Sequence, residues 1–299
     1  DLRLEHVYLR EGRILVIDCV EFSDAYRCSD VALDLAFLVM ELSVRGRDDL
    51  VESLVAGWLE VTGDEQALPL LPFFGAYRAV VRAKVAGMTL MDPAVEPGER
   101  ATLAQGALRH WLWALGRLVP RGEGPALLGV GGRPGTGKTT VARFLEELGW
   151  VVVRSDVVRK ELAGLEESER LDPGAYDLGS RERVYGASFR RAGALLSAGK
   201  RVVVDASFTR DAWRVELLEL AARYGVPCSF VRCIAPDSVV EERLSHRTGD
   251  ASDADFQVFL KALWERESAR TAPLVNVVGT GVSLDEVRER VAQLASELP

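Results

Sequence analysis

Short apolar runs alternate with amphipathic stretches of helical period from about residue 126 to the end of the chain. The apolar runs lie at 127–130, 150–153, 201–204, 228–234 and 274–278. The amphipathic stretches lie at 138–148, 157–162, 183–196, 213–224, 238–244, 256–266 and 284–298. This alternation predicts an α/β domain over residues 126–299, with a parallel sheet sandwiched by helices. A ligand then binds beyond the carboxyl ends of the strands.

The first part of the chain has a different pattern. Two β-branched runs at 6–10 and 13–18 flank a turn at Gly12 and predict a β-hairpin. Helical spacing of apolar residues follows at 30–42, 50–61, 73–86 and 101–118. We therefore expect a mainly helical domain with a hairpin over residues 1–119. A linker follows at 120–125, where Pro120, Gly122, Gly124 and Pro125 interrupt the helical pattern.

A phosphate-binding P-loop motif, G-x-x-x-x-G-K-[ST], joins the first strand of the second domain to its first helix. Its residues and the next one are Gly132, Arg133, Pro134, Gly135, Thr136, Gly137, Lys138, Thr139 and Thr140. Glycines let the backbone turn its N–H groups toward phosphate oxygens, the lysine reaches the β- and γ-phosphates, and the threonine hydroxyl binds Mg²⁺. The motif predicts ATP and Mg²⁺ as cofactors. The alternative is a chance glycine-rich turn, against which the flanking strand and helix argue.

The second predicted strand ends in Arg154-Ser155-Asp156, and Arg159 follows one helical turn later. A carboxylate at this edge of the sheet can accept the proton of a hydroxyl that attacks the γ-phosphate. Arg159 can bind an anionic substrate or the transferring phosphoryl group. The alternative is that Ser155 or Asp156 caps a helix and that Arg159 is solvated.

Asp205 ends the apolar run at 202–204, about 65 residues after the P-loop. This is the form expected of a Walker B carboxylate, which holds Mg²⁺ directly or through water. Thr139 and Asp205 are therefore the candidate metal ligands. The pattern becomes informative only together with the P-loop, because many strands end in Asp.

Two arginines four residues apart, Arg243 and Arg247, precede a polar segment at 248–255. Such a segment can fold over bound ATP as a lid, with its arginines against the phosphates. The alternative is a solvated basic helix face. His246 is given no role, because none of the three histidines clusters with Cys or Asp at metal-ligand spacing.

These features together resemble small P-loop kinases that phosphorylate hydroxyls, such as gluconate-kinase-like, polynucleotide-kinase-like and zeta-toxin-like proteins. The resemblance covers residues 124–298 and implies that Asp156 is the catalytic base. It also implies that Arg243 and Arg247 bind phosphates.

The first part resembles the C-terminal lobe of aminoglycoside-phosphotransferase-like kinases. The resemblance rests on residues 1–6, 16–22 and 30–36. It implies that Asp1 matches the catalytic-loop base and Asp18 the second metal ligand, whereas His6 stands where Asn is usual. The nucleotide-covering loop of such kinases would lie upstream, so we expect a fragment whose first domain does not catalyse independently. For Asp34, inside a helical pattern, we expect a structural role. The joined order resembles bacterial bifunctional aminoglycoside phosphotransferase/ATP-binding proteins.

Charge and composition limit the partners. The net charge of −8 and the pI near 5.2 argue against a general nucleic-acid or anionic-membrane binder. No apolar run approaches the roughly 18 residues of a membrane span. Cys19, Cys28, Cys228 and Cys233 have no C-x-x-C spacing. We expect buried free thiols and a cytoplasmic protein.

The favoured function is an ATP-dependent phosphotransferase that acts on the hydroxyl of an unidentified small-molecule or nucleotide-like acceptor. We expect acceptor specificity to come from residues between 162 and 183. One alternative is an ATP-binding switch or regulatory NTPase without a small-molecule acceptor. Another is aminoglycoside or sugar phosphorylation by the first domain in a longer protein.

Overall fold

The computed structural model describes residues 2–21, 23–166, 169, 178–246 and 256–297. The chain forms two compact units. The first contains Asp1–Pro120 and Ala222–Gly225, and the second contains Arg121–Ala221 and Val226–Pro299. Each unit is described separately below. Within the described residues, no helix is long and apolar enough to cross a membrane.

Unit 1 begins with the short 3-10 helix η1 (Leu4–His6) and an antiparallel hairpin, as the sequence predicts. Strands β1 (Val7–Arg10) and β2 (Arg13–Val16) pair in register through Arg10 and Arg13. Glu11 and Gly12 both have positive φ, 52° and 74°. This two-residue turn matches the right-handed twist of the strands it joins.

Helices make up the rest of unit 1. They are α1 (Asp24–Arg27), α2 (Val31–Val44), α3 (Asp48–Thr62), η2 (Glu65–Leu70), α4 (Leu71–Thr89) and α5 (Pro97–Leu118). The Asp30 carboxylate caps α2 by accepting a hydrogen bond from Ala32 N at 2.8 Å. Small residues on α4 let the Trp113 ring of α5 pack closely, and a Cβ at Gly75 would lie 3.1 Å from that ring. Asp34 forms a 3.5 Å ion pair with Arg78, a structural contact.

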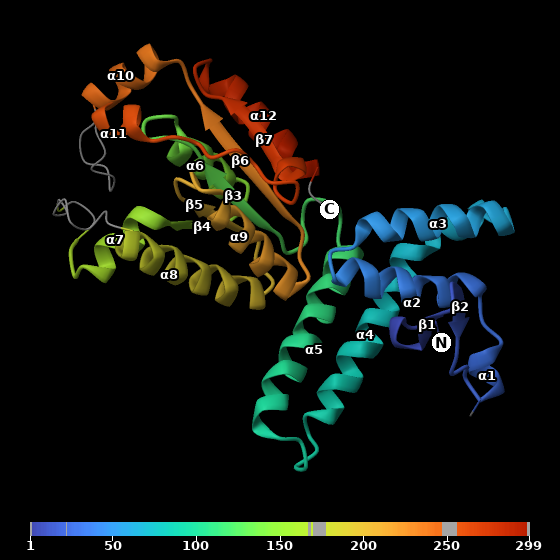
Figure 1. The fold of residues 1–299 in the computed structure, drawn as a ribbon. Coiled ribbons are helices and arrows are strands. Elements are labelled where there is room, and N and C mark those ends of the chain that lie inside the picture. Colours follow the sequence, from blue (N-terminus) through green and yellow to red (C-terminus); the bar gives the residue numbers. More distant parts are fainter. Residues whose placement is uncertain (1, 22, 167–168, 170–177, 247–255, 298–299) are drawn as a thin grey trace. The chain divides into compact units, whose positions relative to one another are not determined.

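Unit 2 is a five-stranded parallel sheet flanked by helices, which confirms the predicted fold class (Figure 1). The strand order is β4 (Val151–Arg154), β5 (Val202–Asp205), β3 (Leu127–Gly131), β6 (Cys228–Ile234) and β7 (Val275–Gly279). The helices are α6 (Lys138–Glu147), α7 (Ser155–Leu162), α8 (Leu178–Ser197), α9 (Asp211–Tyr224), α10 (Asp237–Ser245), α11 (Phe256–Lys261) and α12 (Leu284–Glu297), and a 3-10 turn, η4 (Ala272–Leu274), precedes β7.

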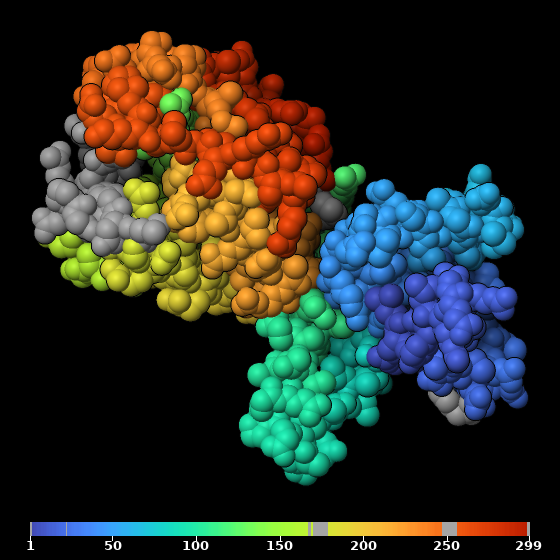
Figure 2. Space-filling model, in the orientation of Figure 1, coloured from blue at the N-terminus to red at the C-terminus, as the bar shows by residue number. Residues whose placement is uncertain are grey.

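The central strand β3 is buried on both faces. Leu128 and Val130 belong to a core shared with α6 and α12 on one face. On the other face Gly129 lies against Leu217 of α9 and Phe230 of β6. In the view of Figure 2, the orange surface of α10 and α11 lies above the yellow and green surface of α7 and α8.

Two expectations from the sequence are wrong. The helix expected at 256–266 ends at Lys261, because the following residues run extended and Trp264 packs between two arginines. Cys19 and Cys28 are exposed thiols, whereas Cys233 is buried and Cys228 partly buried. The two exposed thiols lie outside the packed strands and helices of unit 1, so their apolar neighbours in sequence do not bury them.

A Gly129→Ala substitution tests the packing of the central strand. Its Cβ would lie 2.5 Å from Phe230 Cδ1 and 2.9 Å from Leu217 Cδ2. We expect the free energy of unfolding of unit 2 to fall by about 1–3 kcal/mol through overpacking. The matched control is Gly186→Ala on α8, where the new Cβ meets only Arg190 Nη1 at 3.5 Å. Denaturant titration in which both variants unfold at the same midpoint would contradict this account.

Candidate active site

The P-loop adopts a backbone path that excludes side chains at three positions. Gly132, Gly135 and Gly137 have φ of 143°, 73° and 81°. A Cβ at Gly132 would lie 2.6 Å from the carbonyl oxygen of Cys233, and one at Gly135 would lie 2.7 Å from Val240 Cγ1. Both the conformation and the surrounding atoms therefore require glycine.

Hydrogen bonds within the P-loop fix its shape, and a further one joins it to the segment after the neighbouring strand β5. The Thr136 hydroxyl donates to the Arg133 carbonyl at 2.7 Å, and Lys138 Nζ donates to the same carbonyl at 3.0 Å. Gly132 N donates to Ser207 O at 3.0 Å, which ties the loop to the segment after β5. The Lys138 ammonium is thus held at the amino end of α6, where the helix dipole also favours an anion.

Asp205 lies at the carboxyl end of β5 beside the P-loop. Its Oδ2 accepts a 3.3 Å hydrogen bond from the Thr139 hydroxyl and lies 4.0 Å from Arg154 Nε. The side chain is buried, and burial raises its pKa to about 6, partly offset by the positive charge of Lys138. A buried carboxylate next to a hydroxyl is a suitable place for a cation, which would offset the charge.

The donor set fits Mg²⁺ bound together with a nucleotide. Thr139 and Asp205 offer hard oxygen ligands. Among the described residues, no three His, Cys, Asp or Glu side chains gather at a possible metal site. Phosphate oxygens and water would therefore supply the remaining ligands of Mg²⁺.

Asp156 lies in the first turn of α7, directly after β4. Its Oδ1 accepts a 2.5 Å hydrogen bond from Arg159 Nη1 within an ion pair. The N-cap residue of α7 is Arg154, and no side-chain bond caps the helix there. Asp156 is about 30% exposed, so its carboxylate can meet a ligand. The alternative that Ser155 or Asp156 is the N-cap is therefore wrong.

Arg243 of α10 is hydrogen-bonded to Thr280, a buried residue that also contacts the P-loop. Its guanidinium donates to the Thr280 carbonyl at 2.6 Å and to the Thr280 hydroxyl at 3.2 Å. The same hydroxyl donates to Thr136 O of the P-loop at 2.8 Å. Thr280, after β7, thus joins the P-loop to α10, a role that no motif in the sequence indicates. Arg247 lies outside the described residues, as do residues 167–168 and 170–177 of the segment expected to set specificity.

One cavity of about 260 Å³ brings most of these residues together. The sequence-predicted residues that line it are Pro134, Gly135, Gly137, Lys138, Thr139, Thr140, Asp156, Arg159, Asp205 and Arg243. Tyr185, Thr209 and Val258, which the sequence reasoning missed, line it as well, as do Ser207 and Arg181. Arg181 lies in the segment between 162 and 183 that is expected to set acceptor specificity. Ser207 and Thr209 directly follow β5, whereas Tyr185 and Val258 are distant in sequence and reach this edge of the sheet because the fold brings α8 and α11 there.

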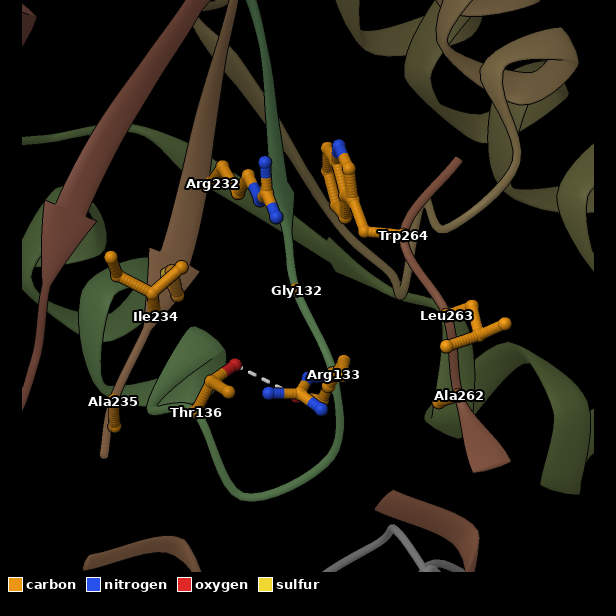
Figure 3. A pocket seen from close by; sticks show the side chains of 10 residues that line it. Gly132, Arg133, Thr136, Arg232, Ile234, Ala235, Ala262, Leu263 and Trp264 are labelled. Carbon is orange, nitrogen blue, oxygen red and sulfur yellow. Dashed lines mark hydrogen bonds between the residues drawn. The ribbon is translucent and has the colours of Figure 1, made fainter. Parts of the chain in front are cut away.

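Three P-loop residues line a second cavity instead, of about 200 Å³ (Figure 3). Gly132, Arg133 and Thr136 face it together with Arg232 and Trp264. Arg133 is engaged on that side, since its guanidinium carbon lies 3.9 Å from the centre of the Phe259 ring. It also lies 3.5 Å from the Asp237 carboxylate. Arg133 therefore contacts α10 and α11 and does not line the larger cavity.

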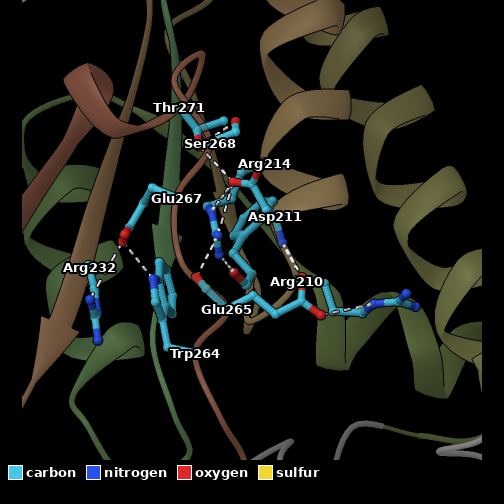
Figure 4. A network of polar contacts seen from close by, with 10 residues as sticks. Arg210, Asp211, Arg214, Arg232, Trp264, Glu265, Glu267, Ser268 and Thr271 are labelled. Atoms are coloured by element: carbon cyan, nitrogen blue, oxygen red, sulfur yellow. Dashed lines mark hydrogen bonds and ion pairs between the residues drawn. The ribbon is translucent and has the colours of Figure 1, made fainter.

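A polar network fixes the extended segment after α11 (Figure 4). The Trp264 ring lies between Arg214 and Arg232, with guanidinium carbons 4.5 and 4.6 Å from its centre. Trp264 Nε1 donates to Glu267 Oε1 at 2.7 Å. Arg214, which is fully buried, donates to Phe208 O at 2.6 Å and to Glu265 O at 2.8 Å. The segment is thereby anchored to the loop that follows Asp205.

That loop is also held from α8. Phe208, a non-glycine residue with φ of 46°, donates its N–H to the Tyr185 hydroxyl at 2.9 Å. Tyr185 stacks on Trp213 with ring centres 4.1 Å apart. Burial raises the pKa of Tyr185 to about 12, so it stays a neutral hydrogen-bonding group. Ser207, between Asp205 and Phe208, is therefore fixed at the rim of the cavity.

Similarity to known proteins extends over residues of both units. Residues 127–273 match the family described as the AAA domain. Uncharacterized protein Rv2004c of Mycobacterium tuberculosis (strain H37Rv) and Uncharacterized protein Mb2027c of Mycobacterium bovis are each 36% identical over 263 residues. The matches cover 86% of this chain and 51% of each relative. The chain thus spans about half the length of the curated relatives it matches.

Solved structures resemble part of the chain. A gluconokinase from Sinorhizobium meliloti 1021 is 26% identical with a TM-score of 0.41, over 57% of this chain and 94% of that one. A sugar kinase from Janibacter sp. HTCC2649 is 20% identical with a TM-score of 0.43, over 56% and 93%. The APS kinase CysC of Mycobacterium tuberculosis, in complex with AMPPNP and APS, is 21% identical with a TM-score of 0.41, over 59% and 98%.

The raised pKa of Asp205 predicts a pH-dependent stability in the metal-free protein. A folded-state pKa of about 6, above the ordinary 3.8, means that the folded state holds this proton more tightly than the unfolded state. Its contribution to stability is present below about pH 4 and is lost as the pH rises through 6. Relative to Asp205→Asn, the wild type should lose about 2–3 kcal/mol of unfolding free energy between pH 4 and pH 7. Denaturant titrations with a chelator present measure this, and parallel pH profiles would contradict the burial of a charged Asp205.

Proposed function

We propose that unit 2 transfers the γ-phosphoryl group of ATP to a hydroxyl of a small acceptor, with Mg²⁺ as cofactor. The observation that carries this proposal is the single cavity that Lys138 and Asp156 line together with Asp205. A site for nucleotide binding needs the phosphate-binding lysine and the metal ligand. A carboxylate beside them, at the end of β4, adds the group that an acceptor hydroxyl requires.

The nucleotide half consists of the P-loop, Lys138, Thr139 and Asp205. The loop N–H groups and the Lys138 ammonium bind the β- and γ-phosphates at the start of α6. Thr139 and Asp205 would hold Mg²⁺, which would supply positive charge against the same phosphates. Arg243 lines the same cavity from α10 and stabilises charge on the transferring group. Arg247 belongs to this group as a prediction from the sequence.

Asp156 accepts the proton of the acceptor hydroxyl as its oxygen forms the bond to the γ-phosphorus. The bond from the γ-phosphorus to the bridging oxygen of ADP breaks in the same displacement, and ADP leaves with those electrons. Arg159 holds the carboxylate of Asp156 at 2.5 Å and fixes its orientation. The protonated Asp156 then returns its proton to water.

Unit 1 supports a second, separate proposal: it resembles the C-terminal lobe of an aminoglycoside-phosphotransferase-like kinase. The hairpin is present, and Asp18 follows its second strand with φ of 64°. The Asp18 carboxylate lies 3.2 Å from His6 Nε2, at the position where that family has Asn. Asp1 lies outside the described residues. We propose that phosphorylation by this unit requires the longer protein.

Asp156→Asn tests the assignment to unit 2. The full chain is incubated with ATP, Mg²⁺ and a metabolite extract, and mass spectrometry identifies the compound that gains one phosphate. We expect the substitution to lower kcat for that acceptor by about 10²–10⁴-fold, because the general base is lost. The affinity for ATP should change little, since Asp156 lies outside the P-loop.

Asp18→Asn is the comparison variant for this experiment. Full transfer in Asp18→Asn with loss in Asp156→Asn assigns the activity to unit 2. The reverse pattern would assign it to unit 1 and overturn the proposal. ATP binding without transfer to any compound would instead favour an ATP-dependent switch.

A further inference from the structure

We infer that the acceptor carries an anionic group in addition to its hydroxyl, and that Arg181 binds this group. The inference rests on the proposed function, because it describes the acceptor half of the same cavity. Its two observations are the contacts of the cations that line the cavity and the position of Arg181 on α8.

Among the described residues, the charged groups that line the cavity are four cations, Lys138, Arg159, Arg181 and Arg243, and two carboxylates, Asp156 and Asp205. Three of the cations are engaged by the protein. Lys138 bonds to a P-loop carbonyl, Arg159 pairs with Asp156, and Arg243 bonds to Thr280. Within the described part of the chain, Arg181 takes part in no ion pair. It is the cation left over when the nucleotide half is assigned.

Helix geometry places Arg181 on the acceptor side. Arg181 and Tyr185 lie four residues apart on α8 and therefore share one face. The Tyr185 hydroxyl lies 3.2 Å from the Ser207 hydroxyl, so this face of α8 is turned toward the end of β5. Arg181 lies about one turn, or ~5.4 Å, nearer the start of the helix. The packing of Tyr185 on Trp213 and Phe208 holds this part of α8 in place.

The remaining lining residues fit a small polar molecule. Ser155, Ser207 and Thr209 supply hydroxyls, and Val258 and Ala262 supply apolar surface on the side of α11. Uncharged hydroxyls can bind the other hydroxyls of a polyol, whereas a guanidinium matches a carboxylate or phosphate through two parallel hydrogen bonds. The cavity is therefore suited to a hydroxylated acid or a sugar phosphate, and a neutral sugar would leave Arg181 without a partner.

Ligand binding to the full chain saturated with Mg²⁺ and AMPPNP tests this inference without requiring turnover. The three probes are polyhydroxylated six-carbon compounds that differ in charge. Sorbitol is uncharged, gluconate carries a carboxylate, and glucose 6-phosphate carries a phosphate. Calorimetry should show binding of at least one anionic probe and at least 10-fold weaker binding of sorbitol. The two anionic probes decide between a carboxylate and a phosphate.

Arg181→Gln should weaken binding of the anionic probe by about 10–100-fold, the range expected when a charge-assisted hydrogen bond is lost. The affinity for AMPPNP should stay the same. The matched control is Arg183→Gln, because Arg183 is also exposed on α8 but its guanidinium bonds to Ser180 and does not line the cavity. It should bind the anionic probe like the wild type.

The outcomes separate the inference from the proposed function. Sorbitol binding as tightly as the anions, no anionic probe binding, or unchanged anion affinity in Arg181→Gln would overturn the inference. A neutral compound emerging as the phosphorylated metabolite would overturn it while the proposed function stands. Binding of an anion through Arg181 without phosphoryl transfer to any compound would support the anion site and sink the proposed function.

Discussion

The close approach of three backbone segments at the carboxyl edge of the sheet is the constraint on which the site depends. The P-loop passes so near the end of β6 and the side chains of α10 that Cβ atoms at Gly132 and Gly135 would collide with Cys233 O and Val240. Thr280 closes the arrangement from β7, because its hydroxyl bonds to the Thr136 carbonyl. The loop therefore holds its shape through contacts with neighbours, and its glycines are fixed by space as well as by conformation.

Charge at this edge is balanced in a way that suits an anionic ligand. Asp205 is buried with a raised pKa, and Lys138 and Arg154 only partly compensate its charge. Asp156 instead is neutralised directly by Arg159. The two carboxylates thus differ in environment, since Asp205 is buried and Asp156 is partly exposed beside an arginine. The segment around Trp264 is anchored by Arg214, which also bonds to Phe208 O in the loop after Asp205.

Local patterns in the sequence predict much of this arrangement. The P-loop motif predicts the strand, the turn and the start of α6, because glycine conformation and helix geometry act over a few residues. Asp156 and Asp205 are recognisable since each follows an apolar strand of a parallel sheet. The end of α11 cannot be predicted in this way. Trp264 continues the helical pattern in the sequence, but in the structure its ring packs between Arg214 of α9 and Arg232 of β6.

The roles of residues whose contacts are distant in sequence cannot be predicted from local patterns. No sequence pattern marks Thr280, which contacts the P-loop only because it follows β7 in the folded sheet. No motif marks Arg181 either, and it lines the cavity only because α8 packs at the end of β5. Arg133 shows the opposite case. It belongs to the motif, yet the structure turns it toward Phe259 and Asp237 on the far side of the loop.

The central claim is that the P-loop and Lys138 form a binding site for the triphosphate of ATP. Calorimetric titration of the full chain with Mg²⁺ and ATP tests it most directly. We expect Lys138→Ala to weaken ATP binding by about 100-fold, because a charge-assisted contact worth ~2–3 kcal/mol is lost. The control Lys200→Ala, an exposed lysine that does not line the cavity, should bind ATP like the wild type. Equal ATP affinity in the wild type and Lys138→Ala would contradict the account.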